Sequence, residues 1–135
     1  MGLMAACNDE DVSDRCIRFE NKQKDYEELV IAIKTQLKGK SLSNTEVIQH
    51  GFYRNKKLYS SLQGYFSKLE IDKIVVLSDN ESMIVSISIH FAETFHQGES
   101  YLIYYIDERE EGEYSSSEYK TCSCTPNWVA VYEEW

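Results

Sequence analysis

The sequence is short of proline, glycine and basic residues. One proline and six glycines stand in 135 residues, and 14 Lys and Arg face 23 Asp and Glu, which gives a net charge of −9. No apolar run approaches the roughly 18 residues that a membrane-spanning helix needs. Because binding to a polyphosphate requires basic side chains that neutralise it, the charge argues against nucleic acid and anionic membranes as partners.

Motifs of catalysis and metal binding are also missing. The three histidines, His50, His90 and His96, form no HExxH or HxH pattern, and the chain has no GxSxG elbow, phosphate loop or dinucleotide fingerprint. The acidic residues lack the D-x-D-x-D-G spacing of a calcium loop. We therefore expect a protein that is not an enzyme and holds no cofactor or metal. A pair of Cys16 and His90 as nucleophile and base stays open, because such groups assemble in space.

The cysteines are few and have no metal-binding spacing. They are Cys7, Cys16, Cys122 and Cys124, with no CxxC pair among them. In a cytoplasmic protein these thiols would be reduced packing residues. In an exported protein, a disulfide from Cys16 to Cys122 or Cys124 would hold the N-terminal tail on the sheet.

The first residues resemble the end of a bacterial lipoprotein signal peptide. In MGLMAAC, Ala5 and Ala6 would precede the cleavage point and Cys7 would carry the lipid. However, Met4 stands where such signals usually place leucine, and six residues leave no room for a charged start and an apolar stretch. As written, the sequence predicts a flexible tail over residues 1–16 and a cytoplasmic protein without a membrane contact. A lipid-anchored envelope protein facing the periplasm is the alternative.

The whole chain has 42% hydrophobic and 13% aromatic residues, which is typical of a folded protein, and we expect residues 17–135 to form one domain. An apolar stripe with helical spacing predicts a helix over Asp25–Lys38. The capping-box pattern Ser43-Asn44-Thr45-Glu46 predicts a short helical turn that closes near Gly51. A second apolar stripe predicts a helix over Tyr53–Leu69.

From residue 71 onward the apolar period changes to two, which predicts strands at 71–77, 83–91, 101–106 and 127–133. In the second of these, Met83, Val85, Ile87, Ile89 and Phe91 share the expected core face, while Ser86, Ser88 and His90 lie with Ile84 on the other. Both faces of 101–106 are apolar, which indicates a central strand. The expected fold is α+β, with N-terminal helices packed on one face of a roughly four-stranded antiparallel meander.

An acidic segment, DEREEGEYSSSE, joins the last two expected strands over Asp107–Glu118. Buried unpaired carboxylates are costly, so this segment is expected in solvent. Tyrosines and tryptophans are frequent around it, and such side chains contribute strongly to protein interfaces. The candidate partner-binding residues are therefore Asp107, Glu108, Glu110, Glu111, Glu113, Tyr114 and Glu118.

The C-terminal part, from about residue 84, resembles small bacterial immunity proteins that neutralise the toxins of competing cells. The resemblance lies in the alternating strand at 84–91, in YLIYYIDE, in the acidic stretch after it and in the terminal NWVAVYEEW. It implies a non-enzymatic inhibitor that covers the active site of a cognate protein toxin. A nuclease-type toxin is basic, so a protein of charge −9 would meet it by steered association. The expected acidic residues would then mimic phosphates, with Tyr114 as an anchor.

Overall fold

The computed structural model describes residues 10–51, 55–91, 98–107 and 119–134. Within these residues it has three helices and one antiparallel sheet of six strands, which confirms the α+β class. The elements are α1 (Glu10–Asn21), α2 (Gln23–Leu37), β1 (Thr45–Gln49), α3 (Lys56–Lys68), β2 (Ile71–Ser78), β3 (Ile84–Phe91), β4 (Gly98–Tyr105), β5 (Tyr119–Ser123) and β6 (Trp128–Glu134).

The strand order in space is β1-β2-β3-β4-β6-β5, and every neighbouring pair is antiparallel. The four expected strands, β2, β3, β4 and β6, lie side by side in the expected order. Two unexpected strands extend the sheet, β1 at one edge and β5 at the other. β4 lies between β3 and β6, which confirms that it is central.

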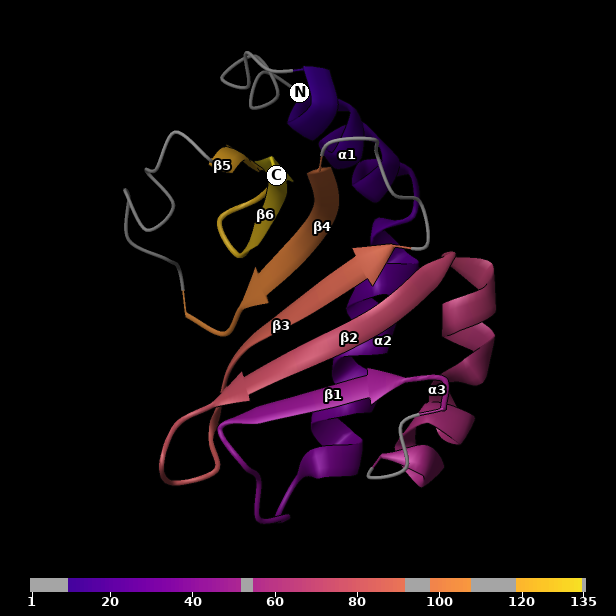
Figure 1. The fold of residues 1–135 in the computed structure, drawn as a ribbon, viewed down its shortest axis with the longest axis vertical. Helices are drawn as coiled ribbons and strands as arrows, with labels where there is room; N and C mark the ends of the chain where they lie inside the picture. Colours follow the sequence, from indigo (N-terminus) through magenta and orange to yellow (C-terminus); the bar gives the residue numbers. More distant parts are fainter. Residues whose placement is uncertain (1–9, 52–54, 92–97, 108–118, 135) are drawn as a thin grey trace.

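The described helices cover one face of the sheet (Figure 1). α1 contacts β4, β5 and β6, α3 contacts β1 and β2, and α2 packs between these two helices. The expected stripe of α2 is buried in the core, at Tyr26, Leu29, Val30, Ile33 and Leu37. We call the opposite face of the sheet the outer face.

The expected flexible tail is wrong for residues 10–16, because α1 begins at Glu10. Val12, Cys16 and Phe19 lie four and then three residues apart on one side of this helix, and each is at most 1% exposed. The Phe19 ring lies 4.8 Å from the ring of Trp128 on β6. With only a few apolar residues among charged ones, the helical stripe was too sparse to predict, and burial against β6 stabilises it.

The expected helical turn at Ser43–Glu46 is also wrong. One contact of the capping box does form, since the Ser43 N–H donates to Glu46 Oε2 at 2.8 Å, and the Ser43 hydroxyl donates to the same oxygen at 2.8 Å. The chain nevertheless continues as β1, in which Ile48 pairs with Ile74 of β2 and is fully buried. Strand pairing with burial of Ile48 therefore outweighs the local helical preference.

A β-bulge in β3 changes which side chains face the core. Leu77 pairs with Ser86, but the next residue, Ser78, pairs with Ile84, so Val85 is an extra residue. Ile84 consequently packs against the helix-side core, whereas Met83 and Val85 are 62% and 49% exposed. The expectation that Met83 and Val85 face the core is wrong, while Ile87, Ile89 and Phe91 are buried as predicted.

The outer face has a buried cluster of its own at β4 and β6. Its members are Tyr101, Ile103, Tyr105, Val129 and Val131. Tyr101 pairs with Val131 and Ile103 with Val129 across the two strands. The apolar character of both faces of β4 and β6 is thus accounted for by two separate clusters.

Candidate protein-binding surface

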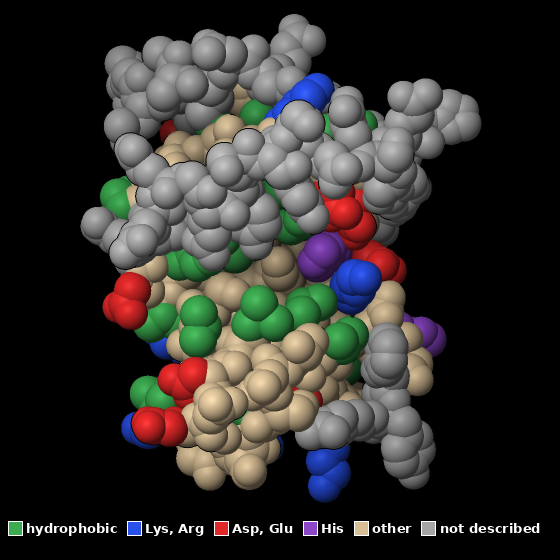
Figure 2. Space-filling view, turned by 60° about the vertical axis from the view of Figure 1, so that its left-hand side comes forward, with side chains coloured by type: hydrophobic (Ala, Val, Ile, Leu, Met, Phe, Trp, Pro, Cys, Tyr) green, Lys and Arg blue, Asp and Glu red, His purple; other side chains and the backbone are tan. Residues whose placement is uncertain are grey.

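The outer face is exposed where β1, β2 and β3 run next to one another. Val47 on β1 pairs with Val75 on β2, and both side chains are half-buried. Leu77, two residues after Val75, lies on the same face and is 43% exposed. Figure 2 shows hydrophobic side chains in a row across this face, with acidic side chains near its left end. The described helices all lie on the other side of the sheet.

Three strongly exposed apolar side chains adjoin this row, and we call Leu77, Met83 and Val85 the exposed apolar patch. Leu77 lies opposite Ser86, the residue next to Val85, and Met83 is two residues before Val85. The bulge turns Val85 outward, since bulges redirect side chains. The strand alternation in the sequence did not predict this patch. The only signal for it in the sequence was the unbroken apolar run Met83-Ile84-Val85, because residues of such a run can point to either face of the sheet.

The turn between β2 and β3 holds Met83 in place. The Asp79 carboxylate accepts hydrogen bonds from the backbone N–H of Glu81 (2.8 Å) and of Met83 (3.0 Å). The Asp79 N–H donates to the Met83 carbonyl at 2.9 Å. Leu42, in the segment between α2 and β1, donates its N–H to Ser82 Oγ at 2.9 Å. The turn is therefore fixed both internally and to the neighbouring segment.

Exposed carboxylates lie next to the exposed apolar patch. Asp79 and Glu81 belong to the same turn as Met83. Ile106, the residue after β4, donates its N–H to the Val85 carbonyl at 3.1 Å. Asp107 follows Ile106 and is exposed. Asp107 is the first of the expected partner-binding residues. The others, Glu108, Glu110, Glu111, Glu113, Tyr114 and Glu118, lie outside the described residues, as does Cys7.

The aromatic side chains of the neighbouring strands pack inside the molecule. Tyr101 and Tyr105 belong to the buried cluster of the outer face, each 7% exposed. Trp128 and Tyr132 are buried on the helix side, where Trp128 lies 5.0 Å from the ring of Tyr104. These aromatics stabilise the sheet, and the exposed contact area of the described outer face is aliphatic.

A histidine–carboxylate pair lies at the other end of the outer face. His90 Nδ1 lies 2.8 Å from Glu99 Oε1, and the His90 ring stacks on Tyr101 at 4.5 Å. Burial lowers the pKa of His90, and the hydrogen bond to Glu99 opposes this only in part. A neutral His90 then donates Nδ1–H to Glu99. This arrangement orients the imidazole, and Cys16 is no partner for it, because Cys16 is buried on the helix side in a disulfide.

That disulfide joins Cys16 of α1 to Cys124, which follows β5, and its Cα atoms are 5.2 Å apart. Cys122 Sγ lies 3.4 Å from Cys16 Sγ. None of the cysteines in the described part of the chain is a free thiol. The structure therefore has one of the two disulfide pairings expected for an exported protein, the one between Cys16 and Cys124.

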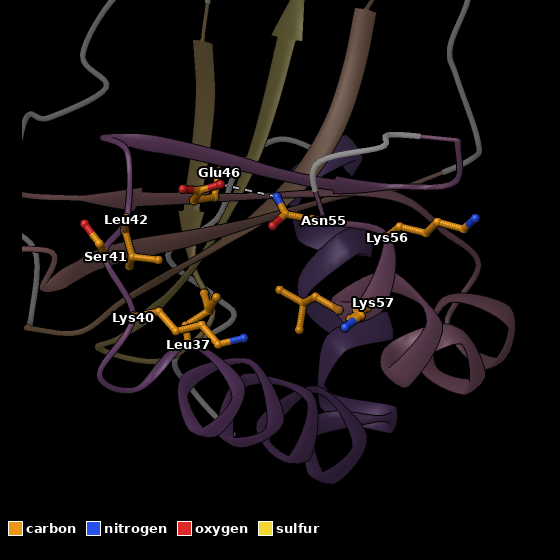
Figure 3. Close-up of a pocket in the computed structure, with 9 residues that line it drawn as sticks. Leu37, Lys40, Ser41, Leu42, Glu46, Asn55, Lys56 and Lys57 are labelled. Carbon is orange, nitrogen blue, oxygen red and sulfur yellow. Dashed lines mark hydrogen bonds between the residues drawn. The ribbon is translucent and has the colours of Figure 1, made fainter.

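A surface pocket with a volume of about 440 Å³ lies where α2 ends and α3 begins (Figure 3). The exposed Lys40, Lys56 and Lys57 line it together with Glu46. Glu46 is 3% exposed and accepts hydrogen bonds from Ser43 and from Asn55 (3.3 Å to Oε1). The Glu46 carboxyl group thus lines the same pocket as the three lysines.

Among the described residues, no group of three or more His, Cys, Asp or Glu side chains is placed to hold a metal ion. Likewise, none of the helices in this part of the chain is both long and apolar enough to cross a membrane. Comparison of the chain with protein-family models, with curated proteins and with solved structures finds no match.

Proposed function

We propose that this protein is a non-enzymatic immunity protein that binds and neutralises a basic bacterial toxin through its outer face. The observation that carries the proposal is the position of the exposed Asp107, the first residue of the acidic segment, directly after Ile106, which is hydrogen-bonded to the exposed Val85. Exposed aliphatic side chains and carboxylates thus adjoin one another on a sheet. Interfaces combine an apolar centre with a polar rim in this way.

Electrostatics supports a basic partner. The net charge of −9 attracts a positively charged protein over a distance and speeds the encounter. Nuclease toxins are one such class, because they carry Lys and Arg to bind phosphates. The acidic segment would meet those residues in place of the nucleic acid.

The test uses the product of the neighbouring gene as the candidate toxin, with cell survival on co-expression and association rates as readouts. Glu108, Glu110, Glu111 and Glu113 are changed together to Lys, which moves the net charge from −9 to −1. We expect association to slow by about ten-fold or more at low salt and by less at high salt. Unchanged binding by this quadruple variant means that the acidic segment is not the interface.

The matched control changes the same amount of charge on the helix side of the molecule. Asp14, Glu20, Glu27 and Glu28 are exposed on α1 and α2, away from the outer face. Their replacement by Lys gives the same net charge, so a rate loss shared by both variants would reflect total charge alone. A loss confined to the acidic-segment variant assigns the contact to that segment.

The disulfide favours a second candidate, an exported envelope protein anchored by a lipid on Cys7. Disulfides persist in oxidising compartments and are rare in the cytosol, and Cys16 and Cys124 are bonded here. The genomic sequence upstream of Met1 tests this candidate, since an in-frame start followed by Lys or Arg and an apolar run would encode a lipoprotein signal. Trapping of thiols in intact cells adds a second readout. If the cysteines are reduced in the cell, this would argue against export. If they are oxidised, this would argue against a cytoplasmic nuclease as the target of the protein.

A further inference from the structure

The exposed apolar patch differs from the other exposed apolar side chains of the described residues. Single exposed apolar side chains are normal on soluble proteins, whereas contiguous ones mark contact surfaces. Ile17 and Ile31, which are 48% and 62% exposed, lie one each on α1 and α2. Leu77, Met83 and Val85 instead lie together where β2 ends and β3 begins, and the half-buried Val75 extends them along the outer face.

The patch is also held ready for contact. Met83 is tied on both its N–H and its carbonyl to Asp79, and Val85 is tied through its carbonyl to Ile106. Binding to groups that are already ordered costs less conformational entropy than binding to a loose loop. A rigid turn that exposes Met83 is therefore a favourable place for an anchor contact.

Charge identifies the partner. The exposed Asp79 and Glu81 share the turn with Met83, and the exposed Asp107 follows Ile106, which is bonded to Val85. The whole protein is also acidic. We infer that the exposed apolar patch is the anchor point for a basic protein, which places an apolar side chain on Leu77, Met83 and Val85 and its Lys or Arg side chains against Asp79, Glu81 and Asp107. This inference rests on the proposed function for the class of partner and adds where and how that partner docks.

The first experiment isolates this chemistry with short synthetic peptides and the full chain. A Lys/Leu peptide combines both features, a Lys/Ser peptide has only the charge, and a Glu/Leu peptide has only the apolar side chains. Backbone amide shifts in NMR spectra report the site. We expect the Lys/Leu peptide alone to shift Leu77, Met83 and Val85. Absence of binding, binding elsewhere, or equal binding of the Lys/Ser or Glu/Leu peptide would overturn the inference.

The second experiment uses variants matched in exposure. Met83→Ser with Val85→Ser removes the anchor, and Ile31→Ser with Ile17→Ser removes equally exposed side chains from the helices. We expect the first pair to weaken the Lys/Leu peptide at least about ten-fold, as for an interface hot spot, and the second to leave its affinity unchanged. Urea unfolding curves verify that both variants are folded. Equal weakening by both pairs would contradict the assigned site.

The two proposals fail separately. If the Lys/Leu peptide binds at the patch but the protein gives no protection against the neighbouring gene product, the immunity function is wrong and the docking site stands. If the protein protects and the Met83→Ser, Val85→Ser variant protects equally well, with an unchanged association rate, the patch is not the docking site.

Discussion

Cys16 on α1 and Cys124 after β5 are joined by a disulfide that closes a loop across 108 positions of the chain. Both side chains are at most 2% exposed and belong to the helix-side core. The bond fixes the first described helix to the edge of the sheet formed by β5 and β6. It connects the two ends of the described chain, so its loss affects the whole fold rather than one loop.

Removal of this disulfide is expected to lower stability. Replacing Cys16 and Cys124 together by Ala frees a long loop in the unfolded chain, and we expect the free energy of unfolding to fall by about 2–5 kcal/mol. Urea titration of the oxidised wild type and the double variant measures the difference. A reductant is the second arm: it should destabilise the wild type more than the variant, which no longer has this bond. Equal unfolding midpoints for wild type and variant would show that the bond contributes nothing to stability.

Because of the β-bulge, we expect the same substitution to change the free energy of unfolding by different amounts on the neighbouring strands β2 and β3. Val85 is 49% exposed and Val76 is fully buried. Val85→Thr should change the free energy of unfolding by less than about 0.5 kcal/mol. Val76→Thr should cost about 1–3 kcal/mol, because a hydroxyl is buried in an apolar site. Similar costs at the two positions would mean that Val85 faces the core and that β3 has no bulge.

His90 should make stability depend on pH. Burial holds its pKa below the ordinary histidine value of about 6.5. Below that value the unfolded chain therefore binds the proton more readily than the folded chain. Stability from a neutral His90 is thus complete above about pH 6.5 and is lost as the pH falls toward the folded pKa.

His90→Gln should flatten the pH dependence of the unfolding free energy between about pH 5 and pH 8. Urea titrations at several pH values provide the measurement. A His90→Gln profile that parallels the wild type would assign the pH dependence to other groups.

Asn55 should stabilise the edge of the sheet at β1. Its Nδ2 donates to the Val47 carbonyl at 2.8 Å and to Glu46 Oε1 at 3.3 Å. Asn55→Ala removes both bonds, and we expect the free energy of unfolding to fall by about 1–3 kcal/mol. Gln49→Ala, which removes an exposed hydrogen bond to Asp72, should cost less than about 0.5 kcal/mol. Thermal unfolding of both variants measures the difference, and equal losses would leave Asn55 without a special role.

The sequence alone predicted the α+β class, α2, most of α3 and the order of four strands. In α2 the buried residues recur every three or four positions, and in β4 and β6 both faces are apolar, so local patterns were sufficient there. The acidic stretch was expected in solvent, and the structure describes Asp107 of it, which is exposed.

Tertiary contacts decided the features that local sequence patterns did not predict, namely α1, β1 and the bulge in β3. α1 is helical because Val12, Cys16 and Phe19 are buried, Phe19 against Trp128 and Cys16 in its disulfide. β1 is a strand because Ile48 pairs with Ile74. The bulge at Val85 depends on how β3 aligns with β2, which strand periodicity does not contain. The local sequence pattern therefore determined α2, α3 and four of the strands of this acidic protein, whereas long-range pairing and burial decided α1, β1 and which side chains reach the surface. The exposed apolar patch, and with it the proposed docking site, exists only in the folded structure.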